Sequence, residues 1–136
     1  MPEKKTLERA QKAGREGKSP STHAGEFVRE EIRHVRQGKH GARSAKQAIA
    51  IGLSKVRRAG VRLRMPEPGT ASPETRERAK RDAARGRHGG GASSPQRSRA
   101  ALRALRREGR GAASSRALAH QASAAARRRR ARRRGR

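Results

Sequence analysis

The sequence predicts a mostly α-helical chain with extensive disorder, in which a small N-terminal helical hairpin precedes a basic, conditionally helical linker and tail. Two features of the composition lead to this class. Of 136 residues, 38 are Lys or Arg and 11 are Asp or Glu, giving a formal net charge of +27. Leu, Ile, Val and Phe together number only 14. Such a chain usually buries too little apolar surface to offset its conformational entropy, so we expect one small folded element at most.

The third observation is where the large apolar residues lie. Ten of the 14 fall between Phe27 and Leu63. The prolines in residues 65–69 would end any helix before them, because proline lacks a backbone donor and restricts its predecessor. We therefore divide the chain into a polar N-terminal helix or arm (1–18), a helical hairpin module (19–65), a basic flexible linker with a marginal helix (66–93), and an Arg/Ala-rich C-terminal module and tail (94–136).

The first helix of the hairpin is predicted over residues 20–37. Ser19 offers an N-cap, and Pro20 suits the first helical position. The apolar residues that follow recur at helical spacing on one face. Glu31 falls inside this apolar stripe. We interpret it as a carboxylate paired with a base on the next helix, and a partner-selecting charge is the alternative.

The second helix is predicted over residues 44–59. Ser44 and Gln47 have the spacing of a capping box at its start. Gly60 is well placed to end the helix in a left-handed conformation, with Val61 packing back on Val56. The local patterns at both ends of this segment agree.

The two helices define one candidate core. Its members are the apolar residues on the facing stripes: Phe27, Val28, Ile32, Val35, Ile49, Leu53 and Val56. A fold of this size usually needs oligomerisation or another partner for stability. We therefore consider a homodimer formed through the hairpin. Ile51 lies off the main stripe, where it would pack under the N-terminal segment or make a dimer contact.

The second half of the chain is different because it has almost no apolar face. A helix after Ser72 would be supported by i,i+4 pairs of Glu and Arg and would be marginal alone. Glycines at 89–91 predict a flexible joint, and Ser94 begins a further helix candidate. Eight of the last ten residues are Arg. We expect a disordered tail that becomes partly helical along a polyanion, since alanine has the best helix propensity.

The charge points to a nucleic acid as the partner. A polyanion relieves the self-repulsion of such a chain, and binding releases the counterions condensed on the polyanion. The sequence therefore predicts a non-enzymatic protein that binds duplex DNA through phosphates, with little sequence readout. The candidate nucleic-acid-binding residues are Arg127, Arg128, Arg129, Arg130, Arg132, Arg133, Arg134, Arg136, Arg103, Arg106, Arg107, Arg57, Arg58 and Lys46.

Other partners stay open at this point. A basic protein of this kind could bind structured RNA or the ribosome, or an acidic protein. It could also be a protein-interaction module whose tail is only a basic anchor. Membrane insertion is not expected, because the tail lacks the large apolar residues that an inserted helix needs. Lys46 and Gln47 lie where recognition helices meet bases. The preceding loop is longer than the usual turn of that motif, so we favour a solvated polar face.

Several classes of function are excluded or disfavoured. The chain has no Cys, Trp or Tyr, so it lacks thiolate chemistry and most of the aromatic surface used to stack single-stranded bases. His23, His34 and His40 surround the hairpin, but a metal site built from them lacks an obvious third and fourth ligand. We expect surface histidines, no metal, no cofactor and no catalytic residue. The N-terminus lacks the apolar core of a signal peptide, which predicts a cytoplasmic protein.

Two stretches resemble a family of short, very basic bacterial proteins that is catalogued as a domain of unknown function. The first consists of GKSPST (17–22), GEFVREEI (25–32), GKHGARS (38–44) and KQAIAIGLSK (46–55). The second consists of RREGR (106–110), AAS (112–114), AL (117–118) and QA (121–122). The resemblance implies a bacterial, cytoplasmic protein with two modules joined by a variable basic linker, and it implies no mechanism.

The closing Ala/Arg tail also resembles the C-terminal tails of linker-histone-like bacterial proteins. That likeness implies, by analogy, a histone-like protein of the bacterial nucleoid that compacts DNA. Arg stands here where such tails usually carry Lys, so the binding mode differs in its donor geometry.

Overall fold

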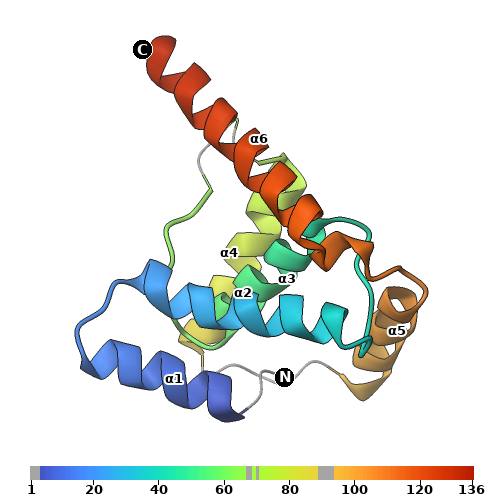
Figure 1. Cartoon of the computed structure of the whole chain (residues 1–136). Helices are drawn as coiled ribbons and strands as arrows, with labels where there is room; N and C mark the ends of the chain where they lie inside the picture. Colours follow the sequence, from blue (N-terminus) through green and yellow to red (C-terminus); the bar gives the residue numbers. More distant parts are fainter. Residues whose placement is uncertain (1–3, 67–68, 70, 89–93) are drawn as a thin grey trace.

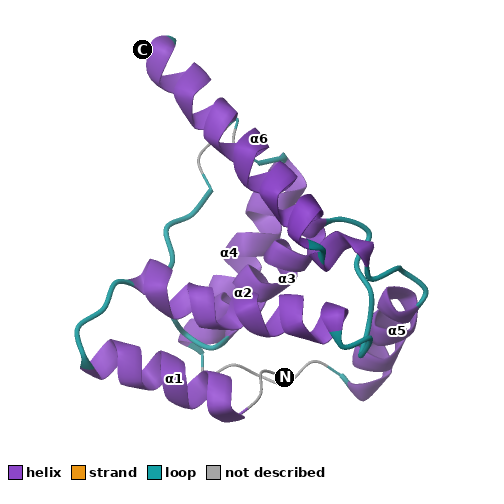
Figure 2. Ribbon diagram, in the orientation of Figure 1, coloured by secondary structure: helices purple, strands orange, loops and turns teal. Residues whose placement is uncertain are grey.

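A computed structural model describes residues 4–66, 69, 71–88 and 94–136. The described residues are mostly helical, contain no β-strand, and form six α-helices and one 3-10 turn (Figures 1 and 2). In chain order these are α1 (Lys4–Arg15), α2 (Pro20–Arg36), α3 (Ala45–Arg58), α4 (Pro73–Arg87), α5 (Pro95–Arg106), η1 (Gly111–Ala113) and α6 (Ser115–Arg134). The predicted glycine joint at 89–91 and part of the predicted boundary at 65–69 lie outside the described residues.

Helices α2 and α3 form the centre of the molecule. They run antiparallel, because Phe27 packs in one core cluster with Val56 while Val35 packs in another with Ala48. They cross closely at Gly52, where a Cβ atom would lie 2.9 Å from the Cα of Val28. A larger residue at this crossing would force the two helices apart.

The predicted ends of α3 are confirmed. Ser44 accepts a hydrogen bond from the Gln47 backbone N–H at 3.1 Å. Gly60 has a φ of +89°, and the Val61 N–H donates to the Val56 carbonyl at 3.3 Å, as in a Schellman motif. The capping box is altered in one respect. The Gln47 side chain accepts from the Arg43 N–H instead of the Ser44 N–H, at 2.6 Å.

The side chains that form the core are smaller than the sequence predicted. Phe27, Val35 and Val56 are fully buried, as predicted. The other predicted core residues are only partly buried, namely Val28, Ile32, Ile49 and Leu53. Much of the buried apolar surface comes from alanines: Ala10, Ala13, Ala24, Ala42, Ala45, Ala48, Ala79 and Ala113. Small side chains allow the close approach of helices, so the chain folds with few large apolar residues.

The hairpin is flanked on both sides. Helix α1 packs against α2, and α4 packs against α3 (Figure 1). The sequence predicted α4 as a marginal helix in a flexible linker, yet it contributes the buried residues Ala79 and Asp82 to the packed body. Ser72 caps α4 by accepting from the Thr75 N–H at 3.2 Å. Gly86 lies so close to the end of α3 that a Cβ atom there would overlap the Arg57 carbonyl oxygen.

The C-terminal segment docks on the loop between α2 and α3. The N–H groups of Gly41 and Ala42 donate to the carbonyls of Leu105 (2.8 Å) and Gly109 (3.1 Å). Ala113 is fully buried beside Val35. A Cβ atom on Gly41 would overlap the Glu108 carbonyl oxygen, so this contact requires glycine. The two stretches that carry the family resemblance therefore pack on one another.

The expected disorder of the tail is not confirmed in the described residues. Helix α6 covers most of the tail and is capped by Ser114, which accepts from the Ala117 N–H at 3.1 Å. Alanine and arginine both have high helix propensity, which favours helix even without an apolar face. Docking of η1 on α2 and α3 adds a fixed starting point for this helix.

Candidate nucleic-acid interface

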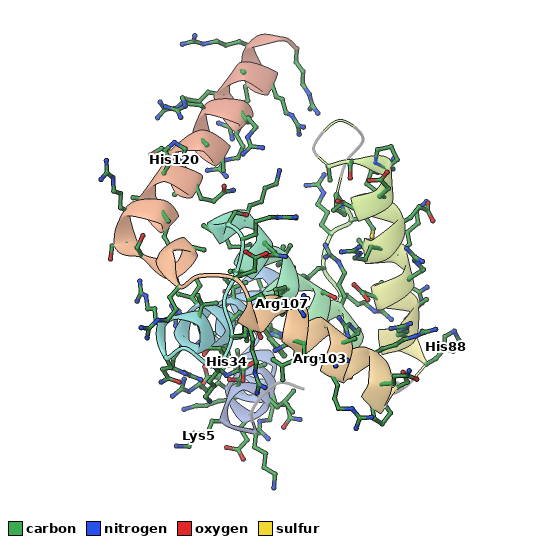
Figure 3. All side chains as sticks on the ribbon, turned by 90° about the vertical axis from the view of Figure 1, so that its right-hand side faces the viewer. Lys5, His34, His88, Arg103, Arg107 and His120 are labelled. Atoms are coloured by element: carbon green, nitrogen blue, oxygen red, sulfur yellow. The ribbon has the colours of Figure 1, made fainter. Side chains whose placement is uncertain are left out.

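The arginines at the end of α6 form an exposed cationic surface. Helix α6 packs on α3 and η1, and its C-terminal half extends away from the body (Figures 1 and 3). All residues from Arg127 to Arg136 are exposed. Residues 109–136 contain ten Arg and no Asp or Glu. The tail therefore carries a high charge with no carboxylate in its own sequence to neutralise it.

These arginines surround the helix instead of lining one face. Successive residues of an α-helix are turned by about 100°. Arg127, Arg128, Arg129 and Arg130 are consecutive, so they point in all directions around the axis, and residues 132–134 repeat the pattern. A helix with side chains is about 10–12 Å across, which matches the width of a B-DNA major groove of about 12 Å. Such a helix can meet phosphates on both walls of a groove.

A groove joins the start of α6 to the start of α3. It has a volume of about 480 Å³ and is lined in part by Arg43, Lys46, Arg116 and His120. All four side chains are exposed, and Figure 3 labels His120 on α6. The predicted residue Lys46 is thereby brought near the C-terminal helix. Sequence reasoning missed Arg43 and Arg116, because only the fold of η1 against α3 brings them together.

The predicted residues on α5 lie elsewhere. Arg103, Arg106 and Arg107 are exposed. Helix α5 packs on no other helix in the described part of the chain. Figure 3 shows Arg103 on α5 and Arg107 directly after it, both well separated from the C-terminal half of α6. The structure does not bring the two groups of arginines into one patch.

Two of the predicted phosphate-binding residues, Arg57 and Arg58, make contacts within the protein. Arg57 is 9% exposed, and its Nη2 lies 3.5 Å from the Arg64 carbonyl. Burial lowers the pKa of Arg57, and the Asp82 carboxylate opposes this effect. Arg58 pairs with Asp82 at 3.3 Å and donates to Ser54 Oγ at 2.8 Å. Arg57 is thus buried where α4 packs on α3, whereas the side chain of Arg58 is 41% exposed beside Asp82. Their assignment to the interface stays a prediction.

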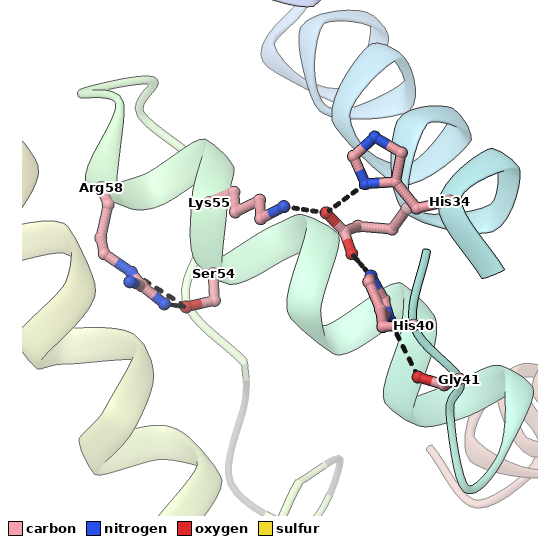
Figure 4. A network of polar contacts seen from close by, with 7 residues as sticks. His34, His40, Gly41, Ser54, Lys55 and Arg58 are labelled. Carbon is pink, nitrogen blue, oxygen red and sulfur yellow. Dashed lines mark hydrogen bonds and ion pairs between the residues drawn. The ribbon is translucent and has the colours of Figure 1, made fainter. Parts of the chain in front are cut away.

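A buried polar cluster lies between α2, α3 and the loop that joins them (Figure 4). The Glu31 carboxylate is contacted by Lys55 Nζ at one oxygen and by His40 Nε2 at the other, at 3.1 Å. His34 Nδ1 lies 3.9 Å from the first oxygen. The interpretation of Glu31 as a carboxylate paired with a base on the next helix is confirmed.

The histidine prediction is wrong for two of three residues. His34 is 9% exposed and His40 is 8% exposed, whereas surface histidines were expected. Glu31 is fully buried between them and supplies the third donor that the sequence did not reveal. The spacing of Glu31 and His34, three residues apart on one helix, was a signal that could have found this cluster.

Comparisons with known proteins add no relative. No family model, no curated protein and no solved structure matches the chain. Within the described residues, none of the helices is both long and apolar enough to cross a membrane.

Proposed function

We propose that this protein is a non-enzymatic, nucleoid-associated protein that binds duplex DNA through its phosphates, largely without sequence preference. The observation that carries the proposal is the exposed, acid-free arginine surface on the C-terminal half of α6. The groove lined by Arg43, Lys46, Arg116 and His120 extends this surface toward α3.

The charge balance separates the tail from the body. In the body, carboxylates contact several of the bases, as in the pairs of Glu31 with Lys55 and of Asp82 with Arg58. Residues 109–136 have no acidic residue. A polyanion is the partner that neutralises such a surface, and the release of counterions makes the association favourable at low salt.

Low sequence preference follows from the geometry of α6. Base-specific contacts need a defined set of side chains held toward base edges. Arginines on all sides of one helix can contact phosphates in many equivalent ways. They do not hold one set of side chains in a fixed register with the bases. We therefore expect similar affinities for unrelated duplexes.

The test compares two full-length variants that each lose four positive charges. In the first, Arg128, Arg129, Arg132 and Arg133 of α6 are replaced by Gln, which keeps helix propensity. In the second, four of the five exposed bases of α1 are replaced by Gln: Lys4, Lys5, Lys12 and Arg15. Binding to a labelled duplex is measured at several salt concentrations. We expect the α6 variant to lose about 3–4 from the log–log salt slope, since each phosphate contact contributes about 0.9.

The α1 variant is the control for net charge. It should keep most of the slope and affinity of the wild type. Equal losses in both variants would show that net charge alone drives binding and would contradict the assignment to α6. A structured RNA of similar length is titrated in parallel, and a clear preference for it at equal salt would replace duplex DNA as the proposed partner.

A further inference from the structure

The buried cluster has the donor set of a transition-metal site. Glu31 and His34 lie on one face of α2 because they are three residues apart, and His40 comes from the loop that follows. One ligand atom from each of the three residues lies within 4.8 Å of the others. The side chains of Glu31, His34 and His40 are 1%, 11% and 8% exposed. Two imidazoles and one carboxylate suit Zn²⁺ and related divalent ions.

The orientation of His40 supports metal binding. Its Nδ1 lies 2.8 Å from the Gly41 carbonyl oxygen, and a carbonyl only accepts, so Nδ1 carries a proton. The other ring nitrogen, Nε2, then faces a Glu31 carboxylate oxygen at 3.1 Å (Figure 4). Histidine metal ligands are typically held in this way, by a carbonyl on the other ring nitrogen.

We propose that Glu31, His34 and His40 bind a divalent ion of the zinc class, and that Lys55 competes with it for Glu31. The Lys55 ammonium contacts the Glu31 oxygen that also faces His34, so it balances the carboxylate when no ion is bound. The Lys55 side chain is 18% exposed, which gives it a path to solvent. Donor atoms around a tetrahedral Zn²⁺ lie about 3.3 Å apart, as bond lengths of about 2.0–2.2 Å require.

The position of the site gives the ion a structural role. It would tie the C-terminal end of α2 to the loop that carries Gly41 and Ala42. The backbone N–H groups of these two residues donate hydrogen bonds to the carbonyls of Leu105 and Gly109. A bound ion would therefore strengthen the docking of the C-terminal module without touching the arginines of α6. The proposal is independent of the proposed DNA binding.

The experiment uses full-length protein without a polyhistidine tag, stripped with a chelator and dialysed. Co²⁺ is titrated as the probe, because its visible d–d absorption reports coordination by nitrogen and oxygen donors. We expect one Co²⁺ per chain, displaced by Zn²⁺. His34→Gln and His40→Gln should each weaken binding by more than about 100-fold, beyond the effect of losing a second-shell partner. The control His88→Gln removes an exposed histidine and should bind Co²⁺ like the wild type.

Lys55→Met gives the sharpest test. If the ion competes with the Lys55 ammonium for Glu31, removing the ammonium should raise the affinity for the ion. We expect this variant to bind Co²⁺ at least about tenfold more tightly than the wild type and to gain thermal stability on addition of Zn²⁺. Circular dichroism shows which variants fold. Absence of a stoichiometric Co²⁺ spectrum in the folded wild type overturns the proposal. Binding that persists in His34→Gln and His40→Gln overturns it as well.

Discussion

Helices α3 and α6 both end in a cluster of bases, yet the two clusters have opposite surroundings. Lys55 and Arg58 of α3 contact Glu31 and Asp82, and Arg57 between them is buried. The arginines that end α6 are exposed, and no acidic residue lies in the surrounding sequence. Helix α3 is covered by α2 and α4, whereas the C-terminal half of α6 extends away from the body.

The difference shows that local sequence alone does not assign a base to a binding surface. The same residue types act as internal counterions in α3 and as an open cationic surface in α6. The location of two carboxylates on neighbouring helices decides between these roles. The three predictions that follow test this contrast, from the largest expected effect to the smallest.

The largest effect is expected from Glu31→Gln. This change leaves Lys55 beside a neutral amide in a buried site, and removing one partner of a buried pair costs about 3 kcal/mol or more. Urea denaturation with a chelator present measures the free energy of unfolding. Glu16→Gln is the control, because Glu16 is exposed and pairs with the exposed residues Lys12 (3.9 Å) and Lys18 (3.0 Å). It should destabilise the protein far less. Equal losses of unfolding free energy in the two variants would mean that the buried cluster stabilises the fold no more than a surface ion pair does.

An intermediate effect is expected from Asp82→Asn. Asp82 accepts from Ser54 Oγ at 2.7 Å and pairs with Arg58, which attaches α4 to α3. Loss of the charge should destabilise the protein by about 1–2 kcal/mol. Hydrogen exchange should show the loss of protection in α4 before α2. Glu77→Gln removes an exposed pair with Lys80 on the same helix and serves as the matched control. Unchanged protection of α4 in Asp82→Asn would contradict the role of Asp82.

The smallest effect is expected from single arginines in DNA binding. Arg129→Gln removes one base from the open surface, so it should reduce the salt slope by at most about 0.9 and the affinity at 0.1 M salt by less than about tenfold. Arg58→Gln removes a base that already pairs with Asp82 and should change neither quantity. Fluorescence anisotropy with a labelled duplex measures both variants. A larger effect of Arg58→Gln than of Arg129→Gln would reverse the comparison.

The central part of the fold was predictable because its signals are local. The caps at Ser44 and Gly60 and the stripe through Phe27 and Val35 depend on spacing within a few residues. The packing of α1 and α4 was not predictable in this way. It depends on buried alanines, which in the sequence indicate only helix propensity. It also depends on Gly86, whose close contact with Arg57 cannot be inferred from the sequence.

The candidate site was predictable in part for the same reason. The arginine content of the tail is visible in the sequence and led directly to the exposed surface of α6. The burial of Arg57 was not predictable, because the residues of α4 that cover it come more than twenty positions later in the sequence. The partner of Glu31 was anticipated, but His40 was not, because the turn after α2 directs its ring back toward the helix.

The arrangement of arginines around α6 also affects the entropy of a bound complex. A helix that presents equivalent charges at every angle can rotate about its axis, or shift along a duplex, and exchange one phosphate contact for another. The bound state then consists of many configurations of similar energy and loses less translational and rotational freedom than a registered complex. We expect such a protein to move along DNA by one-dimensional diffusion while it remains attached.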